Sequence, residues 1–406
     1  MHHNVRAGSM AAVWLGQALI GLILPVSLSI GAISLIDHTV AASGQNSPSQ
    51  DDTLLATPTA RPPNPSLEDF WNNTAAWALE THDTGLPVGE SDTIYMGNGE
   101  YWSYLHASTQ SAGVVDSCGN FVSFPGCVMR WVSTNGGESF TLPEAKCLID
   151  CKTCPCDEAD KTRQQQYPRV VRADTGTFYM VFEHDAETWI TSSKDGLDWQ
   201  TPVGVAGTGM WNGYCYTAMK IGPHPFFETD KDGCMAGGPP GITIVSNTHL
   251  AVFVGFGQNP GHMGCLQTSG MTITGFSRCW PSYLFAGAPT YGSLDVGGGQ
   301  DANPYFDFRY ITSADVLRVG NYYYMSYEGV RGPNATATRD NQFGLGFARS
   351  RIINTTWEEY SDNPVLMDVA DNWGVGHADL LIVDGVTTMY TATPDLTRGR
   401  YVLVWK

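Results

Sequence analysis

Positively charged residues are scarce in this sequence. Among 406 residues, 22 Lys and Arg stand against 40 Asp and Glu, which gives a formal net charge of −18. This excess of negative charge repels the phosphates of nucleic acids and the head groups of anionic lipids. We therefore expect no nucleic acid partner and no anionic membrane surface. A neutral or cationic partner fits the charge better.

Long amphipathic helical patterns are also missing beyond the N-terminal segment. Short apolar strands recur instead, separated by Gly, Asn or Asp turns and followed by aromatic-rich strands. With 42% hydrophobic and 11% aromatic residues, the chain does not have the composition of a disordered protein. These features predict an all-β fold.

The N-terminal segment has no charged residue between Ala11 and Ile36. As a helix, this run would span about 39 Å, which is enough to cross the roughly 30 Å core of a bilayer. It predicts an export signal, and the small residues Val40-Ala41-Ala42 favour cleavage after Ala42 over retention as a membrane anchor. Residues 43–66 are rich in Ser, Thr and Pro and predict a surface linker before a folded domain at 67–406. The protein is then secreted or, if the signal is retained, anchored to the outer face of the membrane.

Ten cysteines fit the oxidising compartment that an export signal implies. Their spacing suggests three local disulfides, namely Cys118–Cys127, Cys215–Cys234 and Cys265–Cys279. The remaining four form either two more disulfides, which we favour, or a zinc site; they are Cys147, Cys151, Cys154 and Cys156. Sequons for N-glycosylation begin at Asn72, Asn334 and Asn354.

A repeat organises the folded part of the chain. Residues 314–321 (ADVLRVGN) align without a gap with residues 378–385 (ADLLIVDG). Three further copies, two of them looser, begin at Ser91, at residue 167 and at Gly241. Five such units, none able to bury both faces alone, predict a five-bladed β-propeller. Two segments, 133–140 and 193–199, resemble the Asp-box turn S-x-D-x-G-x-x-W, which we interpret as structural.

Polar residues at equivalent positions of the repeats should converge on the central funnel of a small propeller. The positions at the starts of the inner strands are Asp92, Arg169, Asp315 and Asp379. The ends of the adjoining strands supply His106, Glu183 and Glu328, and His377 precedes the last repeat position. Two carboxyl groups, one protonated and one ionised, are what glycoside hydrolysis needs. The alternative is that each Asp only caps a strand and accepts backbone N–H groups.

Glu328 is the strongest candidate for a catalytic carboxyl group, because it lies between Tyr327 and Gly329 after an apolar strand. A carboxylate buried there is costly unless it is used or paired. Apolar surroundings and other acids would raise its pKa, as a general acid requires. Glu183 is the second candidate for that role. His377 is a hydrogen-bonding core histidine, a sugar ligand or a residue linked to a metal.

Four short stretches resemble the five-bladed propeller glycosidases, in particular the arabinanase and β-xylosidase group, glycoside hydrolase family 43. They are residues 314–329 (ADVLRVGNYYYMSYEG), 343–350 (FGLGFARS), 357–366 (WEEYSDNPVL) and 376–381 (GHADLL). The resemblance implies an inverting hydrolase that requires no cofactor. Its substrate would be a neutral, arabinan- or xylan-like saccharide. The resemblance implies Asp92 as the base and His377 as the channel histidine near a calcium ion. Asp315 and Glu328 complete the expected catalytic set, and the expected sugar-binding residues are Arg169, Glu183, His377, Asp379 and Trp102.

Two other functions stay open at this point. Tyr167-Pro168-Arg169 and the two Asp-box turns resemble the sialidase-type propellers, which bind a carboxylate through three arginines. A carbohydrate-binding propeller without catalysis is the second alternative, since fold alone does not establish activity. In that case aromatic side chains would stack on sugar rings, or else they pack in the core. The candidates are Trp102, Trp211, Tyr214, Tyr216 and Trp373.

Overall fold

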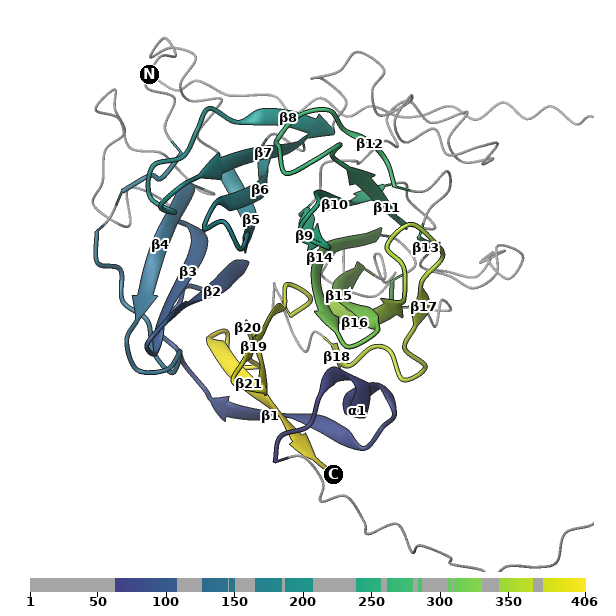
Figure 1. The fold of residues 1–406 in the computed structure, drawn as a ribbon. Helices are drawn as coiled ribbons and strands as arrows, with labels where there is room; N and C mark the ends of the chain where they lie inside the picture. Colours follow the sequence, from purple (N-terminus) through teal and green to yellow (C-terminus); the bar gives the residue numbers. More distant parts are fainter. Residues whose placement is uncertain are drawn as a thin grey trace, which may run out of the picture. The chain divides into compact units, whose positions relative to one another are not determined.

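The computed structural model describes a β-propeller. The described residues are 63–107, 126–144, 146–149, 165–184, 187–206, 239–256, 261–279, 284–286, 306–307, 310–330, 343–367 and 375–406. They contain one short helix, α1 (Leu67–Trp71), and otherwise strands. Five antiparallel sheets surround a central axis (Figure 1), so the prediction of an all-β five-bladed propeller is confirmed.

The blades follow one another along the chain. Blade 1 contains β2 (Ser91–Gly97), β3 (Glu100–Ala107) and β4 (Cys127–Ser133). Blade 2 contains β5 (Gln165–Arg172), β6 (Phe178–His184), β7 (Glu187–Ser193) and β8 (Val203–Ala206). Blade 3 contains β9 (Gly241–Val245), β10 (His249–Phe256), β11 (His262–Gln267), β12 (Ser277–Arg278) and β13 (Phe285–Ala286). Blade 4 contains β14 (Tyr310–Val319), β15 (Tyr322–Val330), β16 (Phe343–Ser350), β17 (Glu358–Glu359) and β18 (Leu366–Met367).

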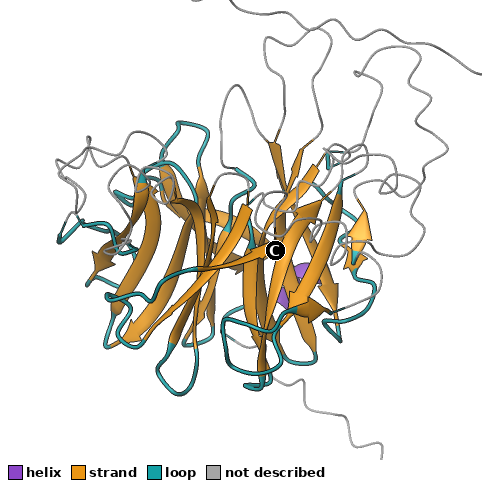
Figure 2. Ribbon diagram, turned by 90° about the horizontal axis from the view of Figure 1, so that it is seen from above, coloured by secondary structure: helices purple, strands orange, loops and turns teal. Residues whose placement is uncertain are grey.

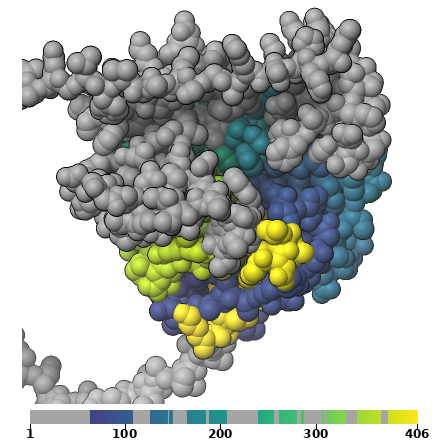
Figure 3. Space-filling model, turned by 180° about the vertical axis from the view of Figure 1, so that it is seen from behind, coloured from purple at the N-terminus to yellow at the C-terminus, as the bar shows by residue number. Residues whose placement is uncertain are grey.

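Blade 5 closes the ring with strands from both ends of the propeller. It contains β19 (Asp379–Val383), β20 (Val386–Ala392), β21 (Arg398–Trp405) and, outermost, β1 (Ala75–Thr81). Strands β1 and β21 are antiparallel, with Ala75 opposite Trp405. The N-terminal and C-terminal colours therefore adjoin in Figures 1 and 3. The early strand pairs with the outer edge of β21, an edge that would otherwise be unpaired.

The hydrophobic core lies between neighbouring blades rather than in one central mass. Five clusters of buried apolar residues each join two blades that are adjacent in the ring. Between blades 2 and 3, for example, Val181 and Ile190 pack with Val252 and Leu266. Figure 2 shows the strands of the blades standing side by side around the axis. Because packing fills the spaces between blades, the side chains that face the axis are free to be polar.

Both Asp-box segments form compact turns. In the second turn, Oδ1 of Asp195 accepts two backbone N–H groups at 2.9 Å, and Oγ of Ser193 accepts the N–H of Gly196 at 2.9 Å. Gly196 has φ +74° and a Cβ atom there would lie 2.5 Å from Oη of Tyr104, so only glycine fits. Asn135 takes the Asp position in the first turn and accepts the N–H of a later residue in the same way. These contacts support the interpretation that the turns are structural.

The two described disulfides join Cys127 to Cys147 and Cys265 to Cys279. The second was predicted correctly. Two predictions are wrong, namely that Cys127 pairs with Cys118 and that Cys147 is bound within the group at Cys147–Cys156. The chain after the first Asp-box turn returns along β4 and places Cys147 beside Cys127. The described part of the chain has no free cysteine. The remaining cysteines lie outside the described residues and are Cys118, Cys151, Cys154, Cys156, Cys215 and Cys234.

None of the described helices is long and apolar enough to span a membrane. The predicted signal and linker lie outside the described residues.

Candidate active site

The first strand of each blade lines the central channel, namely β2, β5, β9, β14 and β19 (Figure 1). Each is antiparallel to the second strand of its blade, so the second strand ends beside the start of the first. We call the end of the channel where the first strands begin the mouth. The repeat positions match in register, since Asp92 pairs with Tyr104, Arg169 with Val181, Asp315 with Ser326 and Asp379 with Tyr390.

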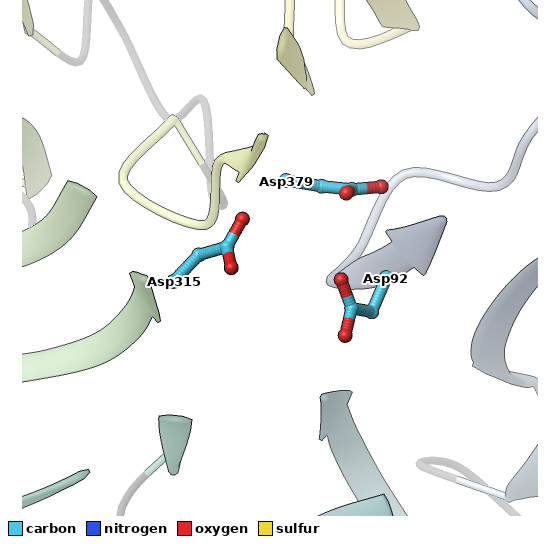
Figure 4. Close-up of side chains that lie close together, drawn as sticks. All are labelled: Asp92, Asp315 and Asp379. Carbon is cyan, nitrogen blue, oxygen red and sulfur yellow. The ribbon is translucent and has the colours of Figure 1, made fainter. Parts of the chain in front are cut away.

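Three aspartates from blades 1, 4 and 5 point toward one another in the channel (Figure 4). One carboxylate oxygen each of Asp92, Asp315 and Asp379 lies within 4.8 Å of the others, and all three side chains are buried. We call them the aspartate ring. Each accepts hydrogen bonds from the next blade. The donors are the N–H of Val170 to Asp92, the N–H of Leu380 to Asp315 at 2.5 Å, and Oγ1 of Thr93 to Asp379 at 2.6 Å.

Two buried arginines balance much of this negative charge. Arg169, 1% exposed, donates to the backbone oxygen of Ser91 at 3.1 Å and to Oγ of Ser313 at 3.0 Å. Arg398, fully buried, donates to the backbone oxygen of His377 at 3.2 Å. Burial lowers the pKa of Arg398 to about 10, against the attraction of Asp379. Three carboxylates at such a distance are tolerable in a buried site only with such countercharge.

Burial raises the pKa of each aspartate in the ring, and repulsion between the carboxylates adds to the rise for Asp92 and Asp315. For Asp92 the burial effect is largest, followed by repulsion from Asp315 and Asp379. The pKa of Asp315 rises to about 6, again mainly by burial, although Arg169 opposes the rise. The ring is therefore a place where a carboxyl group readily takes up a proton, as a general base must.

A second group of titratable side chains lies at the mouth, centred on His377. Nδ1 of His377 lies 2.6 Å from Oε1 of Glu90, and Nε2 lies 2.7 Å from Oε2 of Glu328. Burial would lower the pKa of His377, but the two carboxylates raise it to about 9, which favours the protonated imidazole at neutral pH. Burial raises the pKa of Glu328, and the positive charge of His377 opposes this rise.

A second histidine at the mouth is neutral. Burial lowers the pKa of His106 to about 4, although Glu90 opposes the shift. Nδ1 of His106 accepts the backbone N–H of Tyr167 at 3.3 Å, and the tyrosine ring lies 5.4 Å from each histidine ring. Tyr167 has φ +56° at a β-bulge in β5, and such bulges often redirect side chains near active sites. Glu183 accepts a hydrogen bond from Gln166 at 2.9 Å at the same end of blade 2.

On the side away from the mouth, Asp92 and Asp315 border a cavity of 810 Å³. The cavity follows the inner strands from the ring to their far ends, where Tyr95, Asp174 and Arg318 line it. A water molecule takes up about 30 Å³ in the liquid, so the cavity holds many. Water therefore has a path to the aspartate ring.

The channel gathers most of the residues predicted from the repeat, namely Asp92, Arg169, Asp315, Glu328, His377 and Asp379. Trp102 lies apart from them. Its ring stacks on Phe178 at 6.2 Å, Arg130 lies 4.1 Å from its centroid, and its Nε1 donates to Glu100 at 2.5 Å. Trp102 thus packs between blades 1 and 2. The other aromatic candidates, Trp211, Tyr214, Tyr216 and Trp373, lie outside the described residues.

Sequence reasoning missed Glu90 and Arg398 and treated Tyr167 only as part of a motif. A signal for Glu90 was present, because it stands two residues before Asp92 as His377 stands two before Asp379. Side chains two apart on a strand share a face. Arg398 begins a third strand, where the repeat gives no comparison.

The described residues do not fit the calcium ion that the family resemblance suggests near His377. Both ring nitrogens of His377 are engaged by carboxylates, so neither has a lone pair for a metal. In the aspartate ring, Arg169 and Arg398 already supply two positive charges, which would repel a dication.

No protein-family model matches the sequence, and no curated protein matches it. Solved structures with a similar fold are found. One, from Parabacteroides distasonis and assigned as a glycoside hydrolase, has 15% identity and a TM-score of 0.51 over 80% of this chain and 87% of that chain. An endo-1,4-β-xylanase from Bacteroides thetaiotaomicron has 13% identity and a TM-score of 0.48 over 80% and 92%. An exo-1,5-α-L-arabinanase from a bovine ruminal metagenomic library has 10% identity and a TM-score of 0.46 over 80% and 94%. At these identities the likeness is one of fold.

Proposed function

We propose that the protein is a glycoside hydrolase that cleaves a neutral, arabinan- or xylan-like saccharide. The observation that carries the proposal is the pairing, in one channel, of a buried Glu328 bound to an imidazolium with an aspartate ring that faces a cavity wide enough for water. Paired carboxyl groups of different protonation are the machinery of glycoside hydrolysis. The fold shared with a protein assigned as a glycoside hydrolase supports the same class of reaction.

In this proposal Asp92 is the general base and Glu328 the general acid. Asp92 takes a proton from a water molecule as the new bond to the sugar forms, and Glu328 gives a proton to the departing oxygen as the glycosidic bond breaks. Asp315 lies beside Asp92 and repels its negative charge, which raises the proton affinity of the base. Asp379 and Arg169 hold these groups in place, and we assign sugar contacts at the mouth to His377 and Glu183.

The state of the arginines disfavours the sialidase-type alternative. Arg169 and Arg398 are buried, and their terminal nitrogens donate to the chain itself, those of Arg169 to Ser91 and Ser313 and those of Arg398 to backbone oxygens that include that of His377. An anionic substrate would also have to enter a channel that holds five carboxyl groups, which are those of Glu90, Asp92, Asp315, Glu328 and Asp379. A neutral sugar meets neither obstacle.

We also propose that the protein is exported. Two disulfides among the described residues fit an oxidising compartment. N-terminal sequencing of the protein recovered from its native host would test the cleavage site, with Ser43 as the expected first residue. A chain that still begins at Met1 would support the anchored form instead.

The test of the proposed reaction is a screen of the purified protein against chromogenic pentosides, hexosides and sialosides, with natural arabinan and xylan alongside. We expect hydrolysis of neutral glycosides and none of sialosides. Asp92→Asn and Glu328→Gln proteins serve as matched controls for contaminating activity, because each keeps the shape of the side chain. Hydrolysis of sialosides alone would overturn the substrate class, and binding of saccharides without hydrolysis would overturn the enzymatic role.

A further inference from the structure

We propose that Glu90 is a positioning residue for the proton donor: it holds a proton on His377, so that His377 and Glu328 together keep one proton available at the mouth. The role of that proton in catalysis rests on the proposed function. The proton itself does not, because it follows from the contacts of Glu90, His377 and Glu328.

Glu90 is fully buried and stands immediately before β2. A buried carboxylate is stable only when it is paired and hydrogen-bonded. The salt bridge recorded for it among the described residues is the 2.6 Å contact of Oε1 with Nδ1 of His377. Glu90 is therefore fixed by His377, and His377 in turn is fixed between Glu90 and Glu328.

The contacts of His377 limit the protonation states that the ring and Glu328 can take. A neutral imidazole has one N–H group, whereas an imidazolium has two. Both nitrogens of His377 lie within 2.7 Å of carboxylate oxygens, and an ionised carboxylate only accepts hydrogen bonds. With Glu90 ionised, the arrangement is satisfied either by an imidazolium between two carboxylates or by a neutral ring that accepts a proton from Glu328. In both forms His377 and Glu328 share one proton.

Among the described residues, charged and titratable groups of β3, β5, β19 and β21 also lie near this pair. Arg398 of β21 donates to the backbone oxygen of His377, Arg169 of β5 acts on Glu328, and both oppose a further positive charge. His106 of β3 is neutral, and the ring of Tyr167 of β5 lies 5.4 Å from that of His377. Asp379 follows His377 by two residues and is held by Thr93. The carboxylate of Glu90 lies at Nδ1 of His377 and offsets the repulsion between the two arginines and a protonated His377.

The protons balance in the hydrolysis proposed above. One leaves Glu328 for the departing oxygen as the glycosidic C–O bond breaks, and one passes from the attacking water to Asp92 as the new C–O bond forms. When Asp92 releases its proton to solvent and the His377–Glu328 pair takes one up, the site is restored. Without the charge of Glu90 the pair would lose its proton at a lower pH, because an opposite charge in contact favours the protonated imidazole.

The direct experiment follows the His377 ring by NMR in protein labelled with ¹⁵N-histidine, with the signal assigned by its loss in His377→Gln. In the wild type the ring should stay protonated to well above pH 7, and in Glu90→Gln the titration midpoint should fall by about one to three pH units. Glu358→Gln is the matched control, because Glu358 is an exposed glutamate that pairs with Arg349 on the outer part of blade 4. Its midpoint should equal that of the wild type.

Two results would overturn the proposal. A wild-type His377 that titrates below its ordinary value would show that Glu90 does not hold a proton there, and an unchanged midpoint in Glu90→Gln would show the same. Activity then tests the catalytic link: the alkaline limb of the kcat/KM profile should move to lower pH by the same amount in Glu90→Gln. A shifted midpoint with an unshifted limb would overturn the link, and a wild type inactive on every glycoside would overturn the proposed function while the NMR result stands.

Discussion

A Cβ atom on Gly376 would lie 2.5 Å from Cγ of Glu328. The segment that carries His377 thus passes so close to the backbone of β15 that only a residue without a side chain fits between them. This close approach limits the movement of the Glu328 side chain, and Nε2 of His377 lies 2.7 Å from its carboxylate. The position of Glu328 therefore depends on a glycine that takes no part in the chemistry.

Replacement of this glycine should disturb the donor without removing it. In Gly376→Ala the new methyl group must push Glu328 away, so we expect kcat to fall about 100-fold or more, since a misplacement of about 1 Å has that effect. Gly270→Ala is the control, because no atom lies within 4 Å of a Cβ atom there. The measurement is kcat and KM on one chromogenic substrate. Equal activity of the two variants would contradict a tightly positioned Glu328.

Glu328→Gln tests the acid role. The amide cannot donate a carboxyl proton, so hydrolysis of substrates with poor leaving groups should fall by about 100- to 10,000-fold. Activated aryl glycosides need less protonation and should lose far less. The comparison is kcat/KM on two substrates that share the sugar and differ in the leaving group. Equal losses would reject Glu328 as the donor and direct attention to Glu183.

Asp92→Asn tests the base role. Activity should fall by about 100-fold or more, because general-base catalysis contributes at least that factor. The amide oxygen can still accept the N–H of Val170, and the loss of one charge relieves repulsion in the aspartate ring, so the melting temperature should not fall by more than a few degrees. The control is Asp195→Asn in the second Asp-box turn, where the first turn already tolerates Asn135. An active Asp92→Asn protein would make Asp92 a structural cap.

The repeat explains how much of this site was predictable. Asp92, Asp315 and Asp379 occupy equivalent positions of their blades, and a closed ring of blades brings equivalent positions together, so their convergence follows from the sequence pattern. The contacts across blades do not follow from it. Arg398 reaches the ring from a third strand, and Cys127 pairs according to the path of the chain after β4 rather than by nearness in sequence.

The raised pKa of His377 should also make the free energy of unfolding depend on pH. The pKa of His377 is raised from 6.5 to about 9, so its contribution is fully present below pH 6.5 and is lost as the pH rises through 9. The free energy of unfolding should therefore fall over that range, with a slope of at most about 1.4 kcal/mol per pH unit for one proton. Urea titrations at about pH 6, 7.5 and 9 measure this slope, because these values bracket the pH range in which His377 loses its proton. His377→Gln should be less stable overall but show a flatter dependence, and an equal slope would contradict the shift.

The disulfide between Cys127 and Cys147 can be tested directly, and it differs from the Cys118–Cys127 pairing expected from local spacing. Peptide mapping without reduction should find the Cys127 peptide joined to that of Cys147; a link to Cys118 would contradict the structure. The bridge spans a sequence separation of 20 and the Cys265–Cys279 bridge one of 14. Chain entropy then predicts that removal of either bridge by a double Cys→Ala change costs about 3 kcal/mol of unfolding free energy. The loss for Cys127 and Cys147 should leave activity intact, since both lie in the core between blades 5 and 1 rather than in the channel.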